Sequence, residues 1–356
     1  MPDELQLILA FAGALALVQL TVPMAIRLAV ATGFLDHPAG YKQHGRSTPY
    51  LGGLALMAAV LPVALALGGG SDVLIILACA AGLCVVGTID DRAHLGPGVR
   101  VLAEFAAAFA LWQSDLGWLL WDGNLLDLAL TTLWVVGLVN AFNLMDNLDG
   151  AAGTVGAVSA AGVGLLAGTQ GETAIAAMAF ALAGACAGFL RFNLARPSKV
   201  FLGDGGSMPI GFLVAAGLMA IPATDGFGTA AVFAVVPLVG LVIFDTTLVV
   251  FSRLRRGAGL FTGGRDHLTH RLLGILGTPQ SVALVLAGAQ AALCAAGIVL
   301  YDSTIVTVFG VATAYVVLGA GTIVALEWPY LRSEAKAAAE AALSPAPAPV
   351  RQESGS

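Results

Sequence analysis

The chain has 356 residues, of which 58% are hydrophobic and only 11% are charged. A soluble globular domain carries about 25% charged residues, so this composition is that of an integral membrane protein. The net charge of −6 offers no basic surface to a phosphate backbone, which excludes nucleic acid as a partner.

The apolar runs predict an all-α, polytopic membrane protein. They are long, as helices require, whereas a transmembrane β-barrel would show short segments of alternating hydrophobicity. We expect about eleven membrane-spanning helices of roughly 20 residues each. They fall near residues 5–32, 50–68, 72–89, 98–114, 127–142, 150–168, 173–191, 207–222, 228–251, 279–300 and 303–326. A single membrane-embedded domain is expected over residues 1–330, followed by a disordered cytoplasmic tail over residues 331–356.

The basic residues predict the orientation of these helices. If the first helix runs from the outside to the inside, all 16 Lys and Arg residues fall in or beside the inner loops and the tail. The positive-inside rule then predicts an outer N-terminus and a cytoplasmic C-terminus. The expected location is the plasma membrane, with the polar segments described next on its cytoplasmic face.

The first two polar segments lie before the second helix and at the end of the third. Lys42 and His44 belong to a turn-rich loop and could meet phosphate or nucleobase groups. Asp90 and Asp91 are adjacent carboxylates, which stay ionised together only beside a cation or a basic partner. One interpretation makes Arg92 that partner at an ordinary helix end. The other puts one acid near a divalent ion and the other near a nucleophile.

The third polar segment is NAFNLMDNLDG, from Asn140 to Gly150. Carboxylates and amides at a membrane boundary are costly unless they bind something. Its polar side chains recur every three residues, at Asn140, Asn143, Asp146 and Asp149. On an ideal helix each step of three residues lags by about 60°, so the first and last of them would point in opposite directions. They share one face only if the helix tightens or unwinds, and the alternative interpretation is a hydrated helix cap.

The fourth polar segment, residues 196–211, includes a glycine-rich turn at the start of the eighth helix. Free backbone N–H groups at such a helix start suit a phosphate. Asp204 would repel that phosphate unless a metal ion bridges them. Phe201 could present its ring to a planar base or simply pack at the interface.

The fifth polar segment, residues 253–273, combines a basic cluster with His267 and His270. Histidines three residues apart share a helix face, but no third metal ligand is evident nearby. Because Arg265 and Arg271 stand beside them, binding of an anion or a diphosphate is favoured. The alternative is a basic loop that only orients the protein in the membrane.

One acid stands apart from these segments. Asp245 lies inside the ninth predicted helix and needs an internal partner or a proton. The other acids, with amides, histidines and basic residues, converge on one membrane face. This combination predicts a charged, metal-bridged, phosphate-rich substrate, and an amphiphilic second substrate would explain the membrane helices.

These motifs resemble, from about residue 30 to 275 and in the same order, the polytopic polyprenyl-phosphate N-acetylhexosamine-1-phosphate transferases, especially their GlcNAc-1-phosphate branch. The resemblance implies catalytic roles for Asp90, Asp91, His267 and His270. It implies Mg²⁺, with Mn²⁺ as a substitute, held by Asp204 with help from Asn143. It implies contact with the nucleotide or its diphosphate for Lys42, His44, Asn140, Asp146, Asp149, Phe201, Arg265 and Arg271.

The reaction implied by this resemblance transfers a sugar 1-phosphate, GlcNAc 1-phosphate above all, from a UDP-sugar to undecaprenyl or decaprenyl phosphate. UMP is released, and the step opens the synthesis of a cell-envelope glycan. Relatives of this kind also suggest a homodimer. The alternatives are another UDP-N-acetylhexosamine, a membrane transporter, or an inactive relative that serves as a partner or regulator.

The chain departs from the pattern of these enzymes at three places. Asn147 stands where the family usually has a glycine, and Thr269 precedes His270 where the family commonly has adjacent histidines. An Arg-Lys-x-His pattern appears as residues 41–44, Tyr-Lys-Gln-His. None of the departures removes an acid of the expected metal site, so we expect activity, and Asn147 is where altered sugar choice would first be sought.

Overall fold

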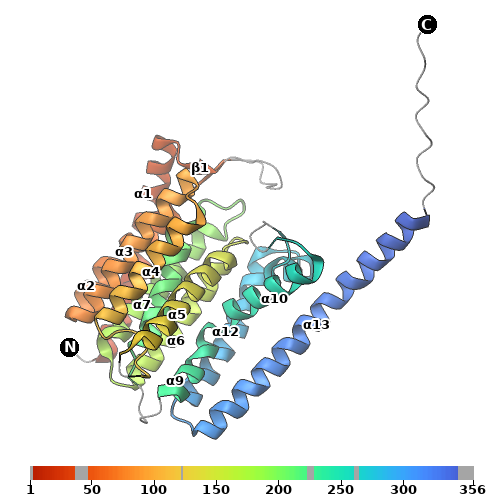
Figure 1. Ribbon diagram of the computed structural model, residues 1–356. Coiled ribbons are helices and arrows are strands. Elements are labelled where there is room, and N and C mark those ends of the chain that lie inside the picture. Colours follow the sequence, from red (N-terminus) through yellow and green to blue (C-terminus); the bar gives the residue numbers. More distant parts are fainter. Residues whose placement is uncertain (1–2, 37–46, 122, 223–227, 260–263, 344–356) are drawn as a thin grey trace. The chain divides into compact units, whose positions relative to one another are not determined.

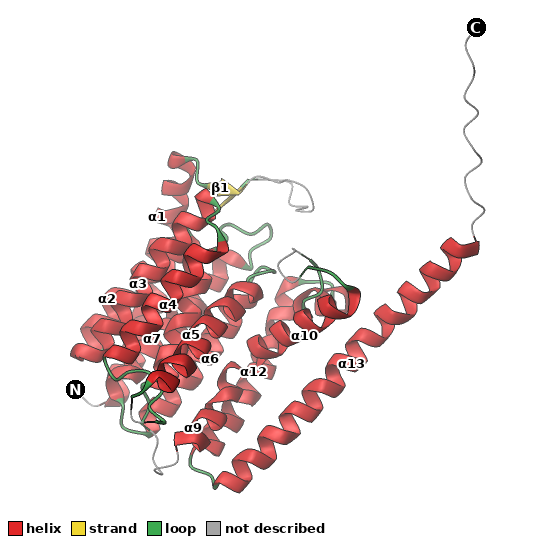
Figure 2. Cartoon of the chain, in the orientation of Figure 1, coloured by secondary structure: helices red, strands yellow, loops and turns green. Residues whose placement is uncertain are grey.

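The computed structural model describes residues 3–36, 47–121, 123–222, 228–259 and 264–343, and nearly all of them are helical (Figures 1 and 2). The predicted all-α class is confirmed. The described strands are β1 (Leu35–Asp36) and β2 (Thr48–Pro49), which pair antiparallel. Residues 37–46, with the predicted Lys42 and His44, lie outside the described residues.

Within the described residues, eight helical segments are long and apolar enough to cross a membrane. They are α1 (Asp3–Thr32), α3 (Gly70–Ala93), α5 (Leu125–Met145), α6 (Ala151–Thr169), α7 (Thr173–Asn193), the run Ala230–Arg256, α12 (Pro279–Tyr301) and Ile305–Trp328. The run comprises most of α9 (Gly228–Val235), the 3-10 turn η1 (Val236–Val239) and α10 (Gly240–Arg256). Pro237 has no backbone N–H, which accounts for the interrupted α-helical pattern at η1.

Three shorter helices correspond to the other predicted spans: α2 (Gly52–Leu67), α4 (Pro97–Gln113) and α8 (Asp204–Met219). They have 16, 17 and 16 residues, fewer than the ~20 that a helix needs to cross a bilayer. Every residue of α8 from Gly205 to Met219 is buried, so protein surrounds this helix. The total of about eleven spans and the orientation of the termini therefore remain predictions, whereas a multi-pass membrane protein is supported by the eight long helices.

The helices approach one another through small residues. α7 packs along both α1 and α6, and α8 packs against α3 and α5. A Cβ atom added at Gly184 of α7 would lie 2.1 Å from the carbonyl oxygen of Phe11 in α1. Glycine is required there because only a hydrogen fits between the two backbones.

The chain divides into two compact units, Met1–Phe309 and Gly310–Ser356. The single domain expected over residues 1–330 stays a prediction. α13 (Ile305–Leu343) continues past residue 331, where the sequence predicted a disordered tail. The sequence EAKAAAEAAL supplies strong helix formers here, which explains the helical residues 331–343.

We expect Gly184→Ala to lower the thermal stability of the purified protein in detergent. The added methyl group would overlap the α1 backbone, and overpacking of this kind costs about 1–3 kcal/mol. The control is Gly82→Ala in α3, where an added Cβ meets nothing within 4 Å. Equal melting temperatures for the two variants would show that the close approach of α1 and α7 contributes little.

Candidate functional site

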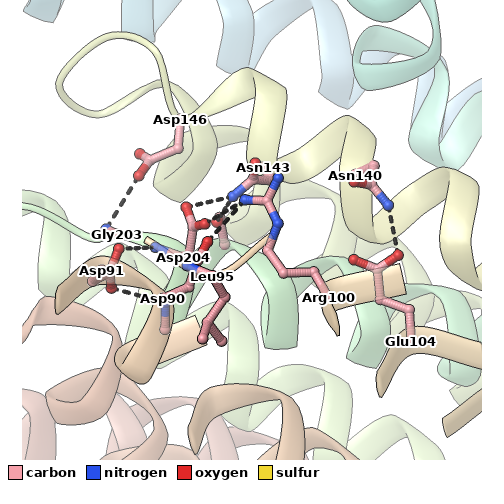
Figure 3. A network of polar contacts seen from close by, with 12 residues as sticks. Asp90, Asp91, Leu95, Arg100, Glu104, Asn140, Asn143, Asp146, Gly203 and Asp204 are labelled. Atoms are coloured by element: carbon pink, nitrogen blue, oxygen red, sulfur yellow. Dashed lines mark hydrogen bonds and ion pairs between the residues drawn. The ribbon is translucent and has the colours of Figure 1, made fainter. Parts of the chain in front are cut away.

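Carboxylates from three helices meet at the first turn of α8 (Figure 3). α3 and α5 both pack against α8, which brings the C-terminal ends of these two helices to its N-terminus. Asp90 and Asp91 come from the end of α3, and Asp146 is the residue that caps α5. Asp204 is the first residue of α8 itself. Four of the acids that the sequence singled out are therefore close together.

Asp91 seals the N-terminus of α8. Its carboxylate accepts hydrogen bonds from the backbone N–H groups of Asp204, at 2.8 Å, and Gly205, at 3.1 Å. The next two N–H groups of the helix donate to the carbonyl oxygen of Gly203. The donors that the sequence predicted to be free for a phosphate are thus bonded within the protein. The phosphate expected at this helix start stays a prediction, and in this structure the carboxyl group of Asp91 occupies these donors.

Gly203 makes this contact between helices possible. Its φ angle is +70°, and an added Cβ would lie 2.5 Å from Asp91 Oδ2. Its N–H donates to Asp146 Oδ2 at 3.2 Å, so the same glycine joins the end of α5. Backbone hydrogen bonds from Gly52 and Gly53 to the carbonyl oxygens of Phe201 and Leu202 hold the approach to α8 against α2.

Arg100 is the cation of the cluster. Its Nη1 lies 3.0 Å from Asp90 Oδ2 and 2.8 Å from Asp204 Oδ2. The sequence interpretation that paired the acids with Arg92 is wrong, because the Arg92 guanidinium lies over the ring of Phe34, 5.5 Å from its centroid. Arg100 escaped attention although it is the one basic residue in α4, and an isolated charge in an apolar helix is itself a functional signal.

Glu104, one turn after Arg100, was missed for the same reason. It is the one acid of α4, its side chain is buried, and it accepts a hydrogen bond from Asn140 Nδ2 at 2.6 Å. Asn140 therefore lies on the wall of the cluster, bonded to Glu104 (Figure 3).

The polar strip from Asn140 to Gly150 divides at the end of α5. Asn143 is still helical, and its Nδ2 donates to Asp204 Oδ1 at 2.6 Å and to Ser207 Oγ at 3.1 Å. The helix ends at Met145, and Asp146 turns toward Gly203. The prediction that the four polar residues cannot share one continuous helical face is confirmed.

Asp149 bonds to α7. It accepts a hydrogen bond from Asn193 Nδ2 at 3.5 Å, and Asn193 Oδ1 accepts one from the N–H of Gly150 at 2.6 Å. A pocket of about 180 Å³ borders Asp149, with residues 194–198 and the start of α12 as its other walls. Asn193 also donates to the carbonyl oxygen of Val200, so this buried amide joins the strip to the segment before α8.

Phe201 packs in the protein rather than standing free as a platform for a base. Its ring meets that of Tyr50 edge to face, with centroids 5.7 Å apart and an interplanar angle of 78°. This contact favours the packing interpretation of the sequence, although Phe201 is only partly buried.

The histidine segment, residues 264–276, is held by α10. His267 Nδ1 lies 2.8 Å from Asp245 Oδ2, and the N–H of Leu268 donates to Asp245 Oδ1 at 2.6 Å. The internal partner predicted for Asp245 is therefore present. His270 lies close to His267, with ring centroids 6.3 Å apart.

The basic residues of this segment have separate partners. Asp266 accepts hydrogen bonds from Arg253 Nε at 2.9 Å and from Arg256 Nη2 at 2.8 Å. Arg271 Nε donates to the carbonyl oxygen of Asp266 at 3.1 Å, and Arg265 is exposed. The described contacts do not bring Arg265, Arg271 or the two histidines into the carboxylate cluster.

Burial and neighbouring charges shift the titration of groups beyond the helix ends. Burial, reinforced by the charges of Asp204 and Asp91, raises the pKa of Asp146 well above its ordinary value. Burial would also raise the pKa of Asp266, but the hydrogen bond and charge of Arg253 lower it below the usual range. Burial, together with the neighbouring His267 and Arg265, lowers the pKa of His270 and so favours its neutral form.

The charges of the site are unbalanced. Asp90, Asp91, Asp146 and Asp204 contribute four carboxylates, and one guanidinium, that of Arg100, bonds to two of them. Like charges this close raise one another's proton affinity unless a cation joins them. The arrangement is therefore suited to bind a further cation, with carboxylate and amide oxygens as its ligands.

Comparison with known proteins agrees with this site. The model of the family described as glycosyl transferase family 4 matches residues 73–222, which include the carboxylate cluster. The chain is 31% identical to a decaprenyl-phosphate N-acetylglucosaminephosphotransferase of Mycobacterium leprae, over 76% of this chain and 80% of that protein.

Two further relatives have related names. A probable undecaprenyl-phosphate N-acetylglucosaminyl 1-phosphate transferase of Bacillus subtilis is 27% identical, over 77% of this chain and 79% of its own length. An undecaprenyl-phosphate alpha-N-acetylglucosaminyl 1-phosphate transferase of Escherichia coli K12 is 28% identical, over 77% and 78%. The chain belongs to the polyprenyl-phosphate N-acetylhexosamine-1-phosphate transferases of glycosyl transferase family 4.

Proposed function

We propose that the protein transfers N-acetylglucosamine 1-phosphate from UDP-GlcNAc to undecaprenyl or decaprenyl phosphate and releases UMP. The observation that carries the proposal is the convergence of Asp90 and Asp204 on one cation position, now taken by the Arg100 guanidinium. Acids at that position would repel a diphosphate unless a metal ion joins the like charges. The names of the relatives support a polyprenyl phosphate as acceptor.

The two adjacent acids take different roles in this proposal. Asp91 uses both carboxylate oxygens to hold the first amides of α8, so we assign it a positioning role. Asp90 shares Arg100 with Asp204 and is the acid that would orient or deprotonate the acceptor phosphate.

The residues present fit a divalent cation. Oxygen ligands of the kind offered by Asp204 and Asn143 suit Mg²⁺, and also Mn²⁺. Among the described side chains, no three or more His, Cys, Asp or Glu residues form a ready metal cluster, and Arg100 lies between the two acids. When bound, Mg²⁺ would neutralise the diphosphate and stabilise charge at the phosphorus under attack.

The cytoplasmic face is proposed for this site because basic residues share its helix ends. Arg92 lies in the last turn of α3 and Arg100 in the first turn of α4, beside the acids, and such residues prefer the inner side of a membrane. A cytoplasmic site would also have access to a soluble nucleotide sugar.

Transport, the alternative from another class, has no observation in its favour. Transporters usually hold ionisable groups near the bilayer midplane. Asp245 is the candidate for such a depth, and its carboxylate is bonded to His267 and to the N–H of Leu268.

The first test is transfer of labelled sugar from UDP-GlcNAc to undecaprenyl phosphate by purified protein with Mg²⁺. We expect a labelled lipid and an equal amount of UMP. A panel of other UDP-N-acetylhexosamines, assayed by UMP release, identifies the sugar. If no donor reacts and UDP does not bind in the presence of Mg²⁺, the chain is an inactive relative.

The metal assignment is tested with Asp204→Asn, which keeps the shape of the side chain and removes its charge. We expect turnover to fall about 100-fold or more, because a metal ion contributes several kcal/mol of transition-state stabilisation. Stabilisation of the protein by Mn²⁺ in thermal unfolding should be lost as well. The control is Asp72→Asn at the other end of α3, where the acid is exposed and bonds to Ser71. Wild-type turnover in Asp204→Asn would contradict the assignment.

The role of Arg100 is tested by thermal unfolding with EDTA and with Mg²⁺. Arg100→Gln leaves two carboxylates without their cation, so we expect it to melt lower than wild type in EDTA. Added Mg²⁺ should reduce the difference, because an ion that binds the folded state stabilises it. Arg100→Lys retains the positive charge and should behave more like wild type. A loss of equal size in both buffers would show that Arg100 and the metal ion occupy unrelated places.

A further inference from the structure

A hydrogen bond joins the polar strip to the histidine segment. Thr269 Oγ1 donates to Asn147 Oδ1, across 122 residues of sequence. Thr269 is fully buried, with 0% of its surface exposed, in α11 (Leu268–Leu276) between His267 and His270. A buried hydroxyl that loses its acceptor is costly, so this contact is a structural link and not an incidental one.

The acceptor side of this bond is held in one orientation. Asn147 Nδ2 donates to the carbonyl oxygen of Leu144 at 2.6 Å, which directs the amide oxygen toward Thr269. The preceding residue, Asp146, bonds to the N–H of Gly203 at the start of α8. The position of Asn147 is therefore tied directly to the carboxylate cluster.

The donor side is held to a different part of the protein. Asp245 in α10 bonds to His267 and to the N–H of Leu268, and Asp266 is gripped by Arg253 of α10. These contacts locate the histidine segment on α10. Among the contacts described above, the Thr269–Asn147 bond connects the histidine segment to the carboxylate cluster.

We propose that Asn147 and Thr269 form a positioning pair. Their hydrogen bond fixes the position of the histidine segment, with His267 and His270, relative to the carboxylate cluster. The inference rests on the proposed function, because it assigns the pair to the transfer reaction. Neither residue is a catalytic one. Without the bond, α10 still keeps the segment near, but a wider range of positions lowers the fraction of complexes aligned for reaction.

Asn147 and Thr269 are two of the three places at which this chain departs from the pattern of the enzymes it resembles. A side chain at position 147 and a hydroxyl at position 269 are each needed for the bond. The two departures thus have one physical explanation, a link between two segments that bring different groups to the site.

The experiment compares Thr269→Val, which removes the hydroxyl at nearly constant shape, with Thr269→Ser, which keeps it. We expect Thr269→Val and Asn147→Ala each to lower kcat about five- to tenfold, with KM for UDP-GlcNAc changed less than about twofold. Thr269→Ser should retain kcat within about twofold. Thr247→Val is the matched control, because that hydroxyl is exposed and bonds within its own helix to Ile243.

The double variant Asn147→Ala/Thr269→Val decides whether the two residues act as a pair. We expect its kcat to match that of either single variant, whereas independent effects would multiply. Multiplied effects, or full kcat in Thr269→Val, would overturn the proposal.

Hydrogen exchange of residues 264–276 tests the link without relying on activity. Exchange should become faster in Thr269→Val and stay as in wild type in Thr269→Ser. Unchanged exchange in Thr269→Val overturns the inference even if the wild type transfers sugar. If the wild type transfers no sugar but exchange is still faster in Thr269→Val than in the wild type, the proposed function is contradicted and the link is not.

Discussion

Repulsion between carboxylates is the constraint on which this structure depends. Acids from the ends of α3 and α5 and from the start of α8 stand close together among packed helices, where charge is costly (Figure 3). The protein meets that cost in two ways. The first two amides of α8 donate hydrogen bonds to Asp91, and Asp90 and Asp204 share the guanidinium of Arg100.

These two devices differ in how easily they can be exchanged. The amides that hold Asp91 belong to the backbone and cannot leave without unwinding α8. The Arg100 side chain is long, and 26% of its surface is exposed, so under the proposed function it would give way to a metal ion. Asp91 would therefore keep its backbone partners throughout the proposed reaction. Asp90 and Asp204 would exchange Arg100 for a metal ion that binds together with the diphosphate.

The sequence was informative wherever a residue type carries its chemistry with it. Asp90, Asp91, Asn143, Asp146 and Asp204 could be predicted as one site because acids and amides beside apolar helices are rarely idle. Partners were harder to predict, because they depend on which helices pack together. The cation was sought at Arg92, next in sequence, and lies at Arg100, on the following helix.

The same limit explains the other differences. Asn193 and Glu104 are joined to the strip only through the packing of α7 and α4, and nothing in their local sequence predicts that contact. The glycine-rich turn indicated free backbone donors at the start of α8, but nothing in the sequence around it predicts that Asp91 of α3 accepts from them. The Ala/Pro/Glu-rich composition of the tail predicted disorder, whereas the alanines of residues 331–343 favour helix.

The burial of α8 has a consequence for how the protein is made. This helix is short, begins with an acid and a glycine pair, and would enter lipid poorly by itself. The helices packed most closely around it, α2, α3, α5, α6 and α7, all precede it in the chain. These five helices have therefore already been synthesised when α8 leaves the ribosome, and α8 can pack against them instead of entering lipid. The order of the helices in the chain thus allows α8, which carries Asp204, to insert after the helices that surround it.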